Sequence, residues 1–279
     1  MIIRCYGARG SIPVSGEAYL RYGGDTTCLE IRTKNDEIII LDAGTGIRRL
    51  GKELLKEERF EYNLLFTHSH WDHILGFPFF KPIYREETEI HLIGCPTTQG
   101  NIKTLLSRTM TAPFFPVPFD KMRAKIRYSN DCQFQFNLDT IEITPIQLSH
   151  PNVGMGYKFE ESGKTFVFLT DNELGYVHRN GRTFDDYVAF SGGADLLIHD
   201  AQFTPEECQH KRTWGHSSFT EALDLAIAAQ VKRFGLFHHN PDRHDGSVDD
   251  MVQQCRRITE SKNIDMDCFA LKPDMELIL

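Results

Sequence analysis

The sequence has no long apolar run and no excess of basic residues, and each absence excludes a class of protein. No apolar segment approaches the roughly 20 residues that span a bilayer, and Met1–Tyr6 does not resemble the start of a signal peptide. The formal net charge of -8 argues against a broad electrostatic attraction to nucleic acid or to an anionic membrane. We therefore expect a cytoplasmic protein without a membrane partner.

The sequence also lacks a C-x-x-C motif. The seven cysteines are dispersed along the chain: Cys5, Cys28, Cys95, Cys132, Cys208, Cys255 and Cys268. An odd, scattered set in a chain without a secretion signal predicts reduced thiols. We expect them to be small core residues rather than metal ligands.

Length and composition indicate one globular domain. A chain of 279 residues with 41% hydrophobic and 25% charged residues is ordinary for a folded α/β protein and excludes extensive disorder. We find no linker and no repeat, and predict a single domain over residues 1–279. A lid or insertion is expected near residues 95–135, where residues 110–120 are aromatic and proline-rich. That segment is either an active-site lid or an irregular connection packed on the core.

Apolar patterning predicts the order of the elements. Strands are expected over residues 2–6, 27–32, 37–41, 62–66, 89–93, 126–128, 133–136, 140–147, 156–159, 165–169, 194–198, 233–237 and 267–271. Helices are expected over residues 47–58, 97–108, 184–190, 218–230 and 247–258. Because both halves contain strands and helices, we predict an α/β protein of two αβ layers packed sheet to sheet.

A loop rich in turn-forming residues, Gly7–Pro13, follows the first predicted strand. Its backbone amides could bind an anion, and Arg9 could add a positive charge. A strand-connecting loop is the simpler interpretation, because glycine and proline turns are common.

Thr67–His73 is the stretch richest in potential metal ligands. It holds three histidines and one aspartate: His68, His70, Asp72 and His73. Imidazole and carboxylate groups suit zinc and neighbouring first-row metals. Alternate side chains of an extended chain share a face, so His68 and His70 point the same way. Asp72 and His73, where the chain turns, can aim at a second point, so the loop predicts two metal positions rather than a solvated turn.

Three more candidate ligands closely follow the ends of later predicted strands. They are His150, Asp171 and His238. Taken singly, His150 could be a hydrogen-bonded loop residue and Asp171 a helix cap. Together with the histidine-rich loop they predict a metal site at one edge of a rigid sheet.

Thr67–His73 resembles the His-x-His-x-Asp-His signature of the metallo-β-lactamase superfamily, and the later candidates fall in the order of its remaining ligands. The resemblance implies an αβ/βα sandwich, in which two mixed β-sheets are flanked by helices around a dinuclear metal site. It implies that one metal is held by His68, His70 and His150, the other by Asp72, His73 and His238, and that Asp171 bridges both. The segment Leu236–His239 resembles the family's Leu-Thr-His-x segment, which selects His238 over His239. The alternation of side chains along the strand predicted over residues 233–237 also selects His238, but only if the strand has the register assumed here. Zinc is the expected metal, with manganese and iron as alternatives.

Two further segments resemble one branch of that superfamily. His199–Phe203 and Gly215–Ser218 are similar to the His-Glu-Ala-Thr-Phe and Gly-His-Ser-Thr segments of tRNA 3′-processing nucleases, with related segments in cyclic-phosphate phosphodiesterases. The resemblance implies that Asp200 orients His216, which protonates the departing oxygen. The alternative is that Asp200 caps a turn and His216 caps the following helix. The chain departs from the nucleases in carrying Asp200 where they carry glutamate.

These residues predict a dinuclear metal-dependent hydrolase, a phosphodiesterase that acts on a small or cyclic phosphodiester through a metal-bridging hydroxide. Asp72, His216 and Asp200 are the expected catalytic residues. RNA is disfavoured as substrate, because residues 110–120 contain no lysine or arginine and no basic arm is visible. The alternatives are a hydrolase of another ester, thioester, lactone or β-lactam, a tRNA 3′-end endonuclease, and a non-catalytic binding module. Relatives of this kind are commonly dimers, so a homodimer is an open expectation.

Overall fold

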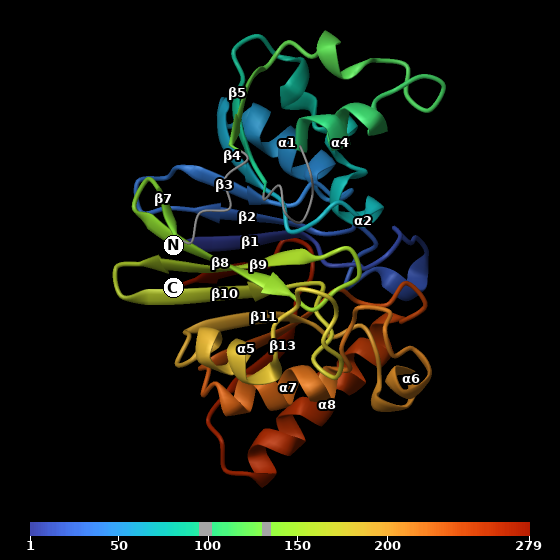
Figure 1. The fold of residues 1–279 in the computed structure, drawn as a ribbon, viewed down its shortest axis with the longest axis vertical. Coiled ribbons are helices and arrows are strands. Elements are labelled where there is room, and N and C mark those ends of the chain that lie inside the picture. Colours follow the sequence, from blue (N-terminus) through green and yellow to red (C-terminus); the bar gives the residue numbers. More distant parts are fainter. Residues whose placement is uncertain (95–101, 130–134) are drawn as a thin grey trace.

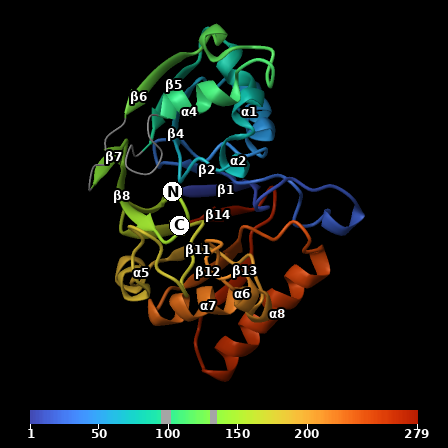
Figure 2. The same ribbon diagram turned by 45° about the vertical axis from the view of Figure 1, so that its right-hand side comes forward.

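Two β-sheets pack face to face, and helices cover the outer face of each (Figure 1). The computed structural model describes residues 1–94, 102–129 and 135–279. Figure 1 shows the first sheet with α1, α2 and α4 in the upper half and the second sheet with α5, α7 and α8 in the lower half. Figure 2, turned by 45°, keeps the same separation. The four-layer α/β architecture predicted from the sequence is confirmed.

The first sheet has the strand order β14-β1-β2-β3-β4-β5-β6. Its strands are β1 (Ile2–Gly7), β2 (Cys28–Arg32), β3 (Ile38–Leu41), β4 (Glu61–Leu65), β5 (Glu89–Ile93), β6 (Lys125–Ser129) and β14 (Glu276–Ile278). Pairing is antiparallel from β14 to β3 and parallel from β3 to β6. The carboxyl ends of the parallel strands lie at one edge of the sheet, where the histidine-rich loop Thr67–His73 begins.

The second sheet has the order β13-β12-β11-β10-β9-β8-β7. Its strands are β7 (Phe136–Leu138), β8 (Ile141–Leu148), β9 (Gly154–Glu161), β10 (Lys164–Leu169), β11 (Leu196–Asp200), β12 (Arg233–Phe237) and β13 (Asp267–Ala270). Strands β10 to β13 are parallel, so the loops that follow β10, β11 and β12 lie at one edge.

Helices pack on the sheets through apolar faces. Their bounds are α1 (Ile47–Lys56), α2 (Trp71–Ile74), α4 (Ile102–Thr109), α5 (Phe184–Ser191), α6 (Pro205–His210), α7 (Phe219–Ala228) and α8 (Asp245–Ser261). Short 3₁₀ helices are η1 (Glu17–Tyr19), η2 (Phe77–Phe79), η3 (Lys81–Tyr84) and η4 (Phe119–Lys121). In α1 the buried residues include Ile47, Leu50 and Leu54, a spacing that places them on one side of the helix.

Aromatic side chains fill the space between the two sheets. Phe166 and Phe168 of β10 lie in one buried cluster with Phe237 of β12 and with Leu41 of β3 in the opposite sheet. The rings of Phe168 and Phe237 meet edge to face, with centroids 5.4 Å apart. This shared core fixes the strand ends of one sheet relative to those of the other.

Several predicted boundaries differ from the structure. The strand expected over 194–198 is β11 and extends to Asp200, so His199 and Asp200 lie inside the strand rather than after it. The short elements α2, α6 and β14 were not predicted from the sequence, although α6 begins with a local capping box of Thr204 and Glu207. Parts of the helix expected over 97–108 and of the strand expected over 133–136 fall outside the described residues.

Five cysteines are described, and all are buried and free: Cys5, Cys28, Cys208, Cys255 and Cys268. Their burial confirms the interpretation as core residues, whereas Cys95 and Cys132 lie outside the described residues. Within the described ranges no helix has both the length and the apolar character needed to cross a membrane.

Arg9 is fully buried and holds two loops together. Its guanidinium donates to the main-chain oxygens of Gly23, Asn240 and Arg243, at 2.8 to 3.1 Å. Its donors are therefore engaged with the backbone, as the simpler interpretation of a strand-connecting loop expects, and they tie the loop after β12 to the N-terminal segment.

Truncation of the inter-sheet core should destabilise the whole fold. We expect Phe168→Ala to lower the free energy of unfolding by about 3–5 kcal/mol, because it leaves a cavity among rings of both sheets. Urea unfolding of the metal-free protein measures the change. Leu20→Ala, at a side chain 78% exposed, is the control and should change it by less than about 0.5 kcal/mol; similar losses in both variants would contradict this account.

Candidate metal centre

The loop after β4 presents its ligand candidates in two directions. His70 is extended (φ −64°, ψ 154°) and precedes α2, whose first turn carries Asp72 and His73. His68 and His70 lie with His150 and Asp171 in one group of four donors. Asp72 and His73 lie in a second group, with Asp171 and His238. The short helix α2 is thus the turn that redirects the chain from the first group to the second.

Within each group the donor atoms lie within 4.8 Å of one another, and nearly all of these side chains are buried. The first group combines the loop after β4 with loops after β8 and β10, and the second adds the residue after β12. All seven ligand positions expected from the sequence are therefore brought together.

Asp171 lies between the two groups and turns one oxygen to each. Its Oδ2 is 3.5 Å from His68 Nε2 and 3.8 Å from His150 Nε2. Its Oδ1 is 3.4 Å from His73 Nε2 and 3.1 Å from His238 Nε2. Burial opposes its charge, but His238 and His73 hold the pKa of this carboxyl well below its usual range. A carboxylate in this position can contact both members of a metal pair.

His238, and not its neighbour His239, faces the cluster. His238 adopts a left-handed backbone conformation (φ 58°), uncommon for a residue other than glycine. Its Nε2 lies 2.9 Å from Asp72 Oδ2. His239 instead donates from Nε2 to the main-chain oxygen of Leu271, at 2.8 Å.

Hydrogen bonds at Nδ1 leave the opposite nitrogen of several histidines for a metal. His73 donates to Asp42 at 2.8 Å, His150 to the Gly215 carbonyl at 2.8 Å, and His238 to Gln202 at 2.7 Å. Within the described part of the chain, the buried Nε2 atoms of His68 and His73 have no hydrogen-bond partner. Buried imidazole nitrogens without a hydrogen-bond partner, on rings whose second nitrogen is fixed, fit the coordination of a divalent cation.

Burial also favours the metal-binding form of the first group. It lowers the pKa of His150 to about 3 and the pKa of His68 well below its ordinary value. Both imidazoles are therefore neutral near pH 7 and offer a lone pair.

Asp200 and His216 form a pair beside these groups. His216 Nδ1 donates to Asp200 Oδ2 at 2.7 Å, and its ring stacks on that of His238 with centroids 4.9 Å apart. Burial opposes the charged imidazole, but Asp200 and Asp171 outweigh it and raise the pKa of His216 to about 9. The geometry is that of an acid–base pair.

Of the alternative roles considered for Asp200 and His216, the structure supports only the turn cap by Asp200. Ser218, rather than His216, caps α7, because its side chain accepts from the Glu221 amide. Asp200 does cap a turn, since its Oδ1 accepts from the Gln202 amide at 2.9 Å, but its other oxygen pairs with His216.

Residues that hold the histidines in place were missed by sequence reasoning. Asp42 accepts from the Thr67 amide at 2.8 Å, from the Thr67 hydroxyl at 2.7 Å and from His73. Glu173 accepts from the Thr213 and Gly215 amides, both at 2.8 Å, and so fixes the loop that leads to His216. The position of Asp42, directly after a buried strand, was the available signal.

Two glycines allow the close approach of these loops. A Cβ atom at Gly215 (φ +91°) would lie 2.2 Å from His150 Nδ1, and one at Gly10 would lie 2.3 Å from His238 Nδ1. Any side chain at either position would displace a candidate ligand.

The chain is similar to known proteins over most of its length. It is 25% identical over 268 residues to Ribonuclease Z of Haloarcula marismortui, covering 80% of this chain and 83% of that relative. The metallo-beta-lactamase fold protein YhfI of Bacillus subtilis superposes with a TM-score of 0.71 at 17% identity, covering 99% and 98% of the two chains. A diphosphatase from the PhnP family superposes with a TM-score of 0.68 at 14% identity, covering 100% and 97%.

A family model, the beta-lactamase superfamily domain, matches residues 38–239. That span runs from β3 to the residue after His238 and includes every candidate ligand described above. The chain therefore belongs to the β-lactamase superfamily.

Proposed function

We propose that this chain is a metal-dependent phosphodiesterase whose substrate is a small or cyclic phosphodiester. The observation that carries the proposal is the Asp200–His216 pair, which lies against His238 and within 4.0 Å of Asp171. Hydrolysis of a thioester, a lactone or a β-lactam would need the clustered ligands but not this pair. The names of the similar ribonuclease and diphosphatase, which denote reactions at phosphorus, support the same choice.

The two donor groups would hold two divalent ions, with zinc expected and manganese or iron as alternatives. His68, His70 and His150 would hold one ion, Asp72, His73 and His238 the other, and Asp171 both. When bound, such ions neutralise the phosphate charge and lower the pKa of a water molecule toward about 7.

Asp72 would orient the attacking water by accepting its hydrogen bond. Its carboxylate is fixed because Oδ2 accepts from the Ser11 amide at 2.7 Å and faces His238 Nε2. Burial opposes the charge of Asp72, but His73 and His238 hold its pKa well below the usual range. Asp72 is therefore an anion and an acceptor near neutral pH.

His216 would protonate the leaving oxygen. Because Nδ1 is bonded to Asp200, the ring orientation is fixed and Nε2 carries the proton that can be donated. An alkoxide leaving without a proton is a poor leaving group at neutral pH, and such help is typically worth ~10²–10⁴ in rate.

The charge of the chain favours a small substrate over a nucleic acid. The net charge is -8, and residues 110–120 carry no lysine or arginine. RNA binding depends on several cationic contacts to phosphates.

We further propose that residues 1–279 form one domain, since β14 pairs with β1 and joins the two ends of the chain in one sheet.

RNA cleavage is the second candidate, favoured by the identity to the archaeal ribonuclease Z. The metal-reconstituted protein should hydrolyse cyclic nucleotides or bis-nitrophenyl phosphate with a higher kcat/KM than it cleaves a 3′-extended tRNA transcript. A β-lactam and a thioester complete the panel. A higher kcat/KM for the transcript would assign the protein as a nuclease instead. Turnover of the β-lactam or the thioester alone would reject a phosphodiesterase.

Metal content should follow the two donor groups. After reconstitution and dialysis, we expect the unmodified protein to hold on the order of two ions per chain, and His150→Ala and His238→Ala about one each. Plasma emission spectrometry measures the ratio. His91→Ala is the control, because His91 lies on β5 and bonds Ser129 outside the cluster. An unchanged metal content in both ligand variants would refute the assignment.

The loss caused by His216→Ala should depend on the leaving group. We expect turnover of an alkyl diester to fall by ~10²–10⁴, and turnover of a nitrophenyl diester to fall far less, because nitrophenolate leaves without a proton. Asp200→Ala should show the same pattern more weakly. Metal content is the control and should stay unchanged. Equal losses on both diesters would show that His216 is not the proton donor.

A further inference from the structure

Ser11 is an exposed residue in direct contact with the buried donor cluster. Its main-chain amide donates to Asp72 Oδ2 at 2.7 Å. Asp72 itself is only 5% exposed, and His238, which faces the same oxygen, is fully buried. Ser11 therefore lies where the second donor group meets solvent, at a place that a substrate can reach.

The backbone at Ser11 is strained. Its φ is 64°, in the left-handed region that residues with a side chain rarely adopt. The Ile12 amide donates to the Gly10 carbonyl at 2.7 Å, and this bond closes a three-residue turn around Ser11. Such a turn with a positive φ at its centre is rare in proteins. Strained residues concentrate at active sites, where the surrounding structure holds them in place.

Contacts from both halves of the site hold this turn. The Gly10 amide donates to the His239 carbonyl at 2.9 Å, and Gly10 packs so closely on His238 that it has no room for a side chain. From the other half of the site, the Asp72 carboxylate accepts from the Ser11 amide. The position of Ser11 is therefore fixed relative to both Asp72 and His238.

The hydroxyl group of Ser11 keeps a proton that it can donate. Its oxygen accepts from Gln202 Nε2 at 3.4 Å, while the Gln202 carbonyl oxygen accepts from His238. Among the residues that the structure describes, none accepts the proton of this hydroxyl. Since the amide nitrogen and the hydroxyl oxygen of one serine are at most about 4 Å apart, the hydroxyl lies within roughly 7 Å of Asp72 Oδ2. A phosphate group beside Asp72 comes within reach of this donor.

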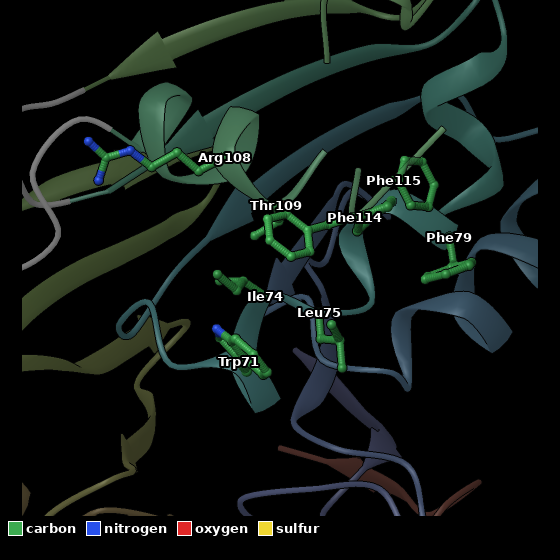
Figure 3. A pocket seen from close by; sticks show the side chains of 9 residues that line it. Trp71, Ile74, Leu75, Phe79, Arg108, Thr109, Phe114 and Phe115 are labelled. Atoms are coloured by element: carbon green, nitrogen blue, oxygen red, sulfur yellow. The ribbon is translucent and has the colours of Figure 1, made fainter. Parts of the chain in front are cut away.

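The cavity beside α2 does not reach the donors. It has a volume of about 420 Å³ and lies between the α2 segment and the segment after α4, where Trp71 and Phe114 line it (Figure 3). None of its lining residues belongs to either donor group. A group bound at the donors is therefore out of contact with this cavity, whereas Ser11 touches the second donor group directly.

We propose that the Ser11 hydroxyl binds the substrate by donating a hydrogen bond to a phosphoryl oxygen of the diester. This inference rests on the proposed function and adds a substrate-binding residue to it. A phosphoryl oxygen carries negative charge, and hydrogen bonds to charged groups are stronger than those between neutral groups. Because the turn is fixed before binding, the hydroxyl loses little freedom when the substrate arrives. Ser11 contacts the phosphoryl group itself, whereas His216 acts on the leaving oxygen.

Ser11→Gly tests the proposal, because glycine adopts the same backbone conformation and keeps the amide that binds Asp72. We expect kcat/KM to fall by ~10- to 100-fold, and by the same factor for an alkyl diester and a nitrophenyl diester. This uniform loss distinguishes Ser11 from His216, whose removal affects mainly the alkyl diester. An unchanged kcat/KM, or a loss confined to the alkyl diester, would overturn the proposal.

Ser162→Gly is the matched control for Ser11→Gly. Ser162 is also an exposed serine with a positive φ, of 53°. It lies in the turn between β9 and β10, at the end of β10 opposite to the one that leads to Asp171. We expect this variant to keep the kcat/KM of the unmodified protein on both diesters. A loss equal to that of Ser11→Gly would show that the effect is not specific to the site.

A structural role of the hydroxyl is the competing explanation. The hydroxyl contacts Gln202, and Gln202 orients His238, so a structural role predicts that Ser11→Gly loses metal from the second donor group. We expect its metal content, measured by plasma emission spectrometry, to equal that of the unmodified protein. A lower metal content with a proportional loss of turnover would overturn the proposal.

Binding of inorganic phosphate keeps the test independent of turnover. In isothermal titration calorimetry of the metal-reconstituted proteins, we expect a dissociation constant about tenfold higher for Ser11→Gly than for the unmodified protein and for Ser162→Gly. Equal dissociation constants, or no binding by any of the three proteins, would reject the contact. Failure of every phosphodiester to turn over would reject the proposed function, and this titration would still decide the role of Ser11.

Discussion

The buried carboxylate of Asp171 is the group around which the site is built. It is almost inaccessible to water, and imidazole nitrogens approach both of its oxygens. A buried charge of this kind costs several kcal/mol unless it is compensated. The compensation comes from loops that follow strands of both sheets, so their relative position must be fixed. The aromatic core between the sheets supplies that rigidity, and this links the packing of Phe168 and Phe237 to the geometry of the donors.

A second set of contacts determines how each imidazole is turned. Asp42, Gln202 and the Gly215 carbonyl accept from Nδ1 of three different histidines. Each bond selects the tautomer whose Nε2 lone pair is directed into the cluster. Glu173 acts one step further away, by holding the amides of the loop that carries Gly215. The donor set is therefore preorganised by the protein before any cation binds.

Local pattern was enough to find the candidate ligands but not the groups that orient them. The spacing of His68, His70, Asp72 and His73 has meaning on its own, because an extended segment followed by a turn aims its side chains in two directions. Asp42 and Gln202 act on histidines 31 and 36 positions away. The place of Asp42 directly after a buried strand hints at a role but does not name its partner, and nothing local marks Gln202. For the same reason β14 was missed, since only its pairing with β1 at the other end of the chain makes it a strand.

The two carboxylate oxygens of Asp200 link two parts of the proposed site. Asp200 lies inside β11, and from there its Oδ2 reaches His216 at 2.7 Å. Its Oδ1 accepts from the Gln202 amide, and the Gln202 side chain accepts from His238. The proposed proton donor and a proposed metal ligand are thus joined through Asp200 and Gln202. Exchanging Asp200 for glutamate would lengthen one end of that chain of contacts, so it would have to move either His216 or His238.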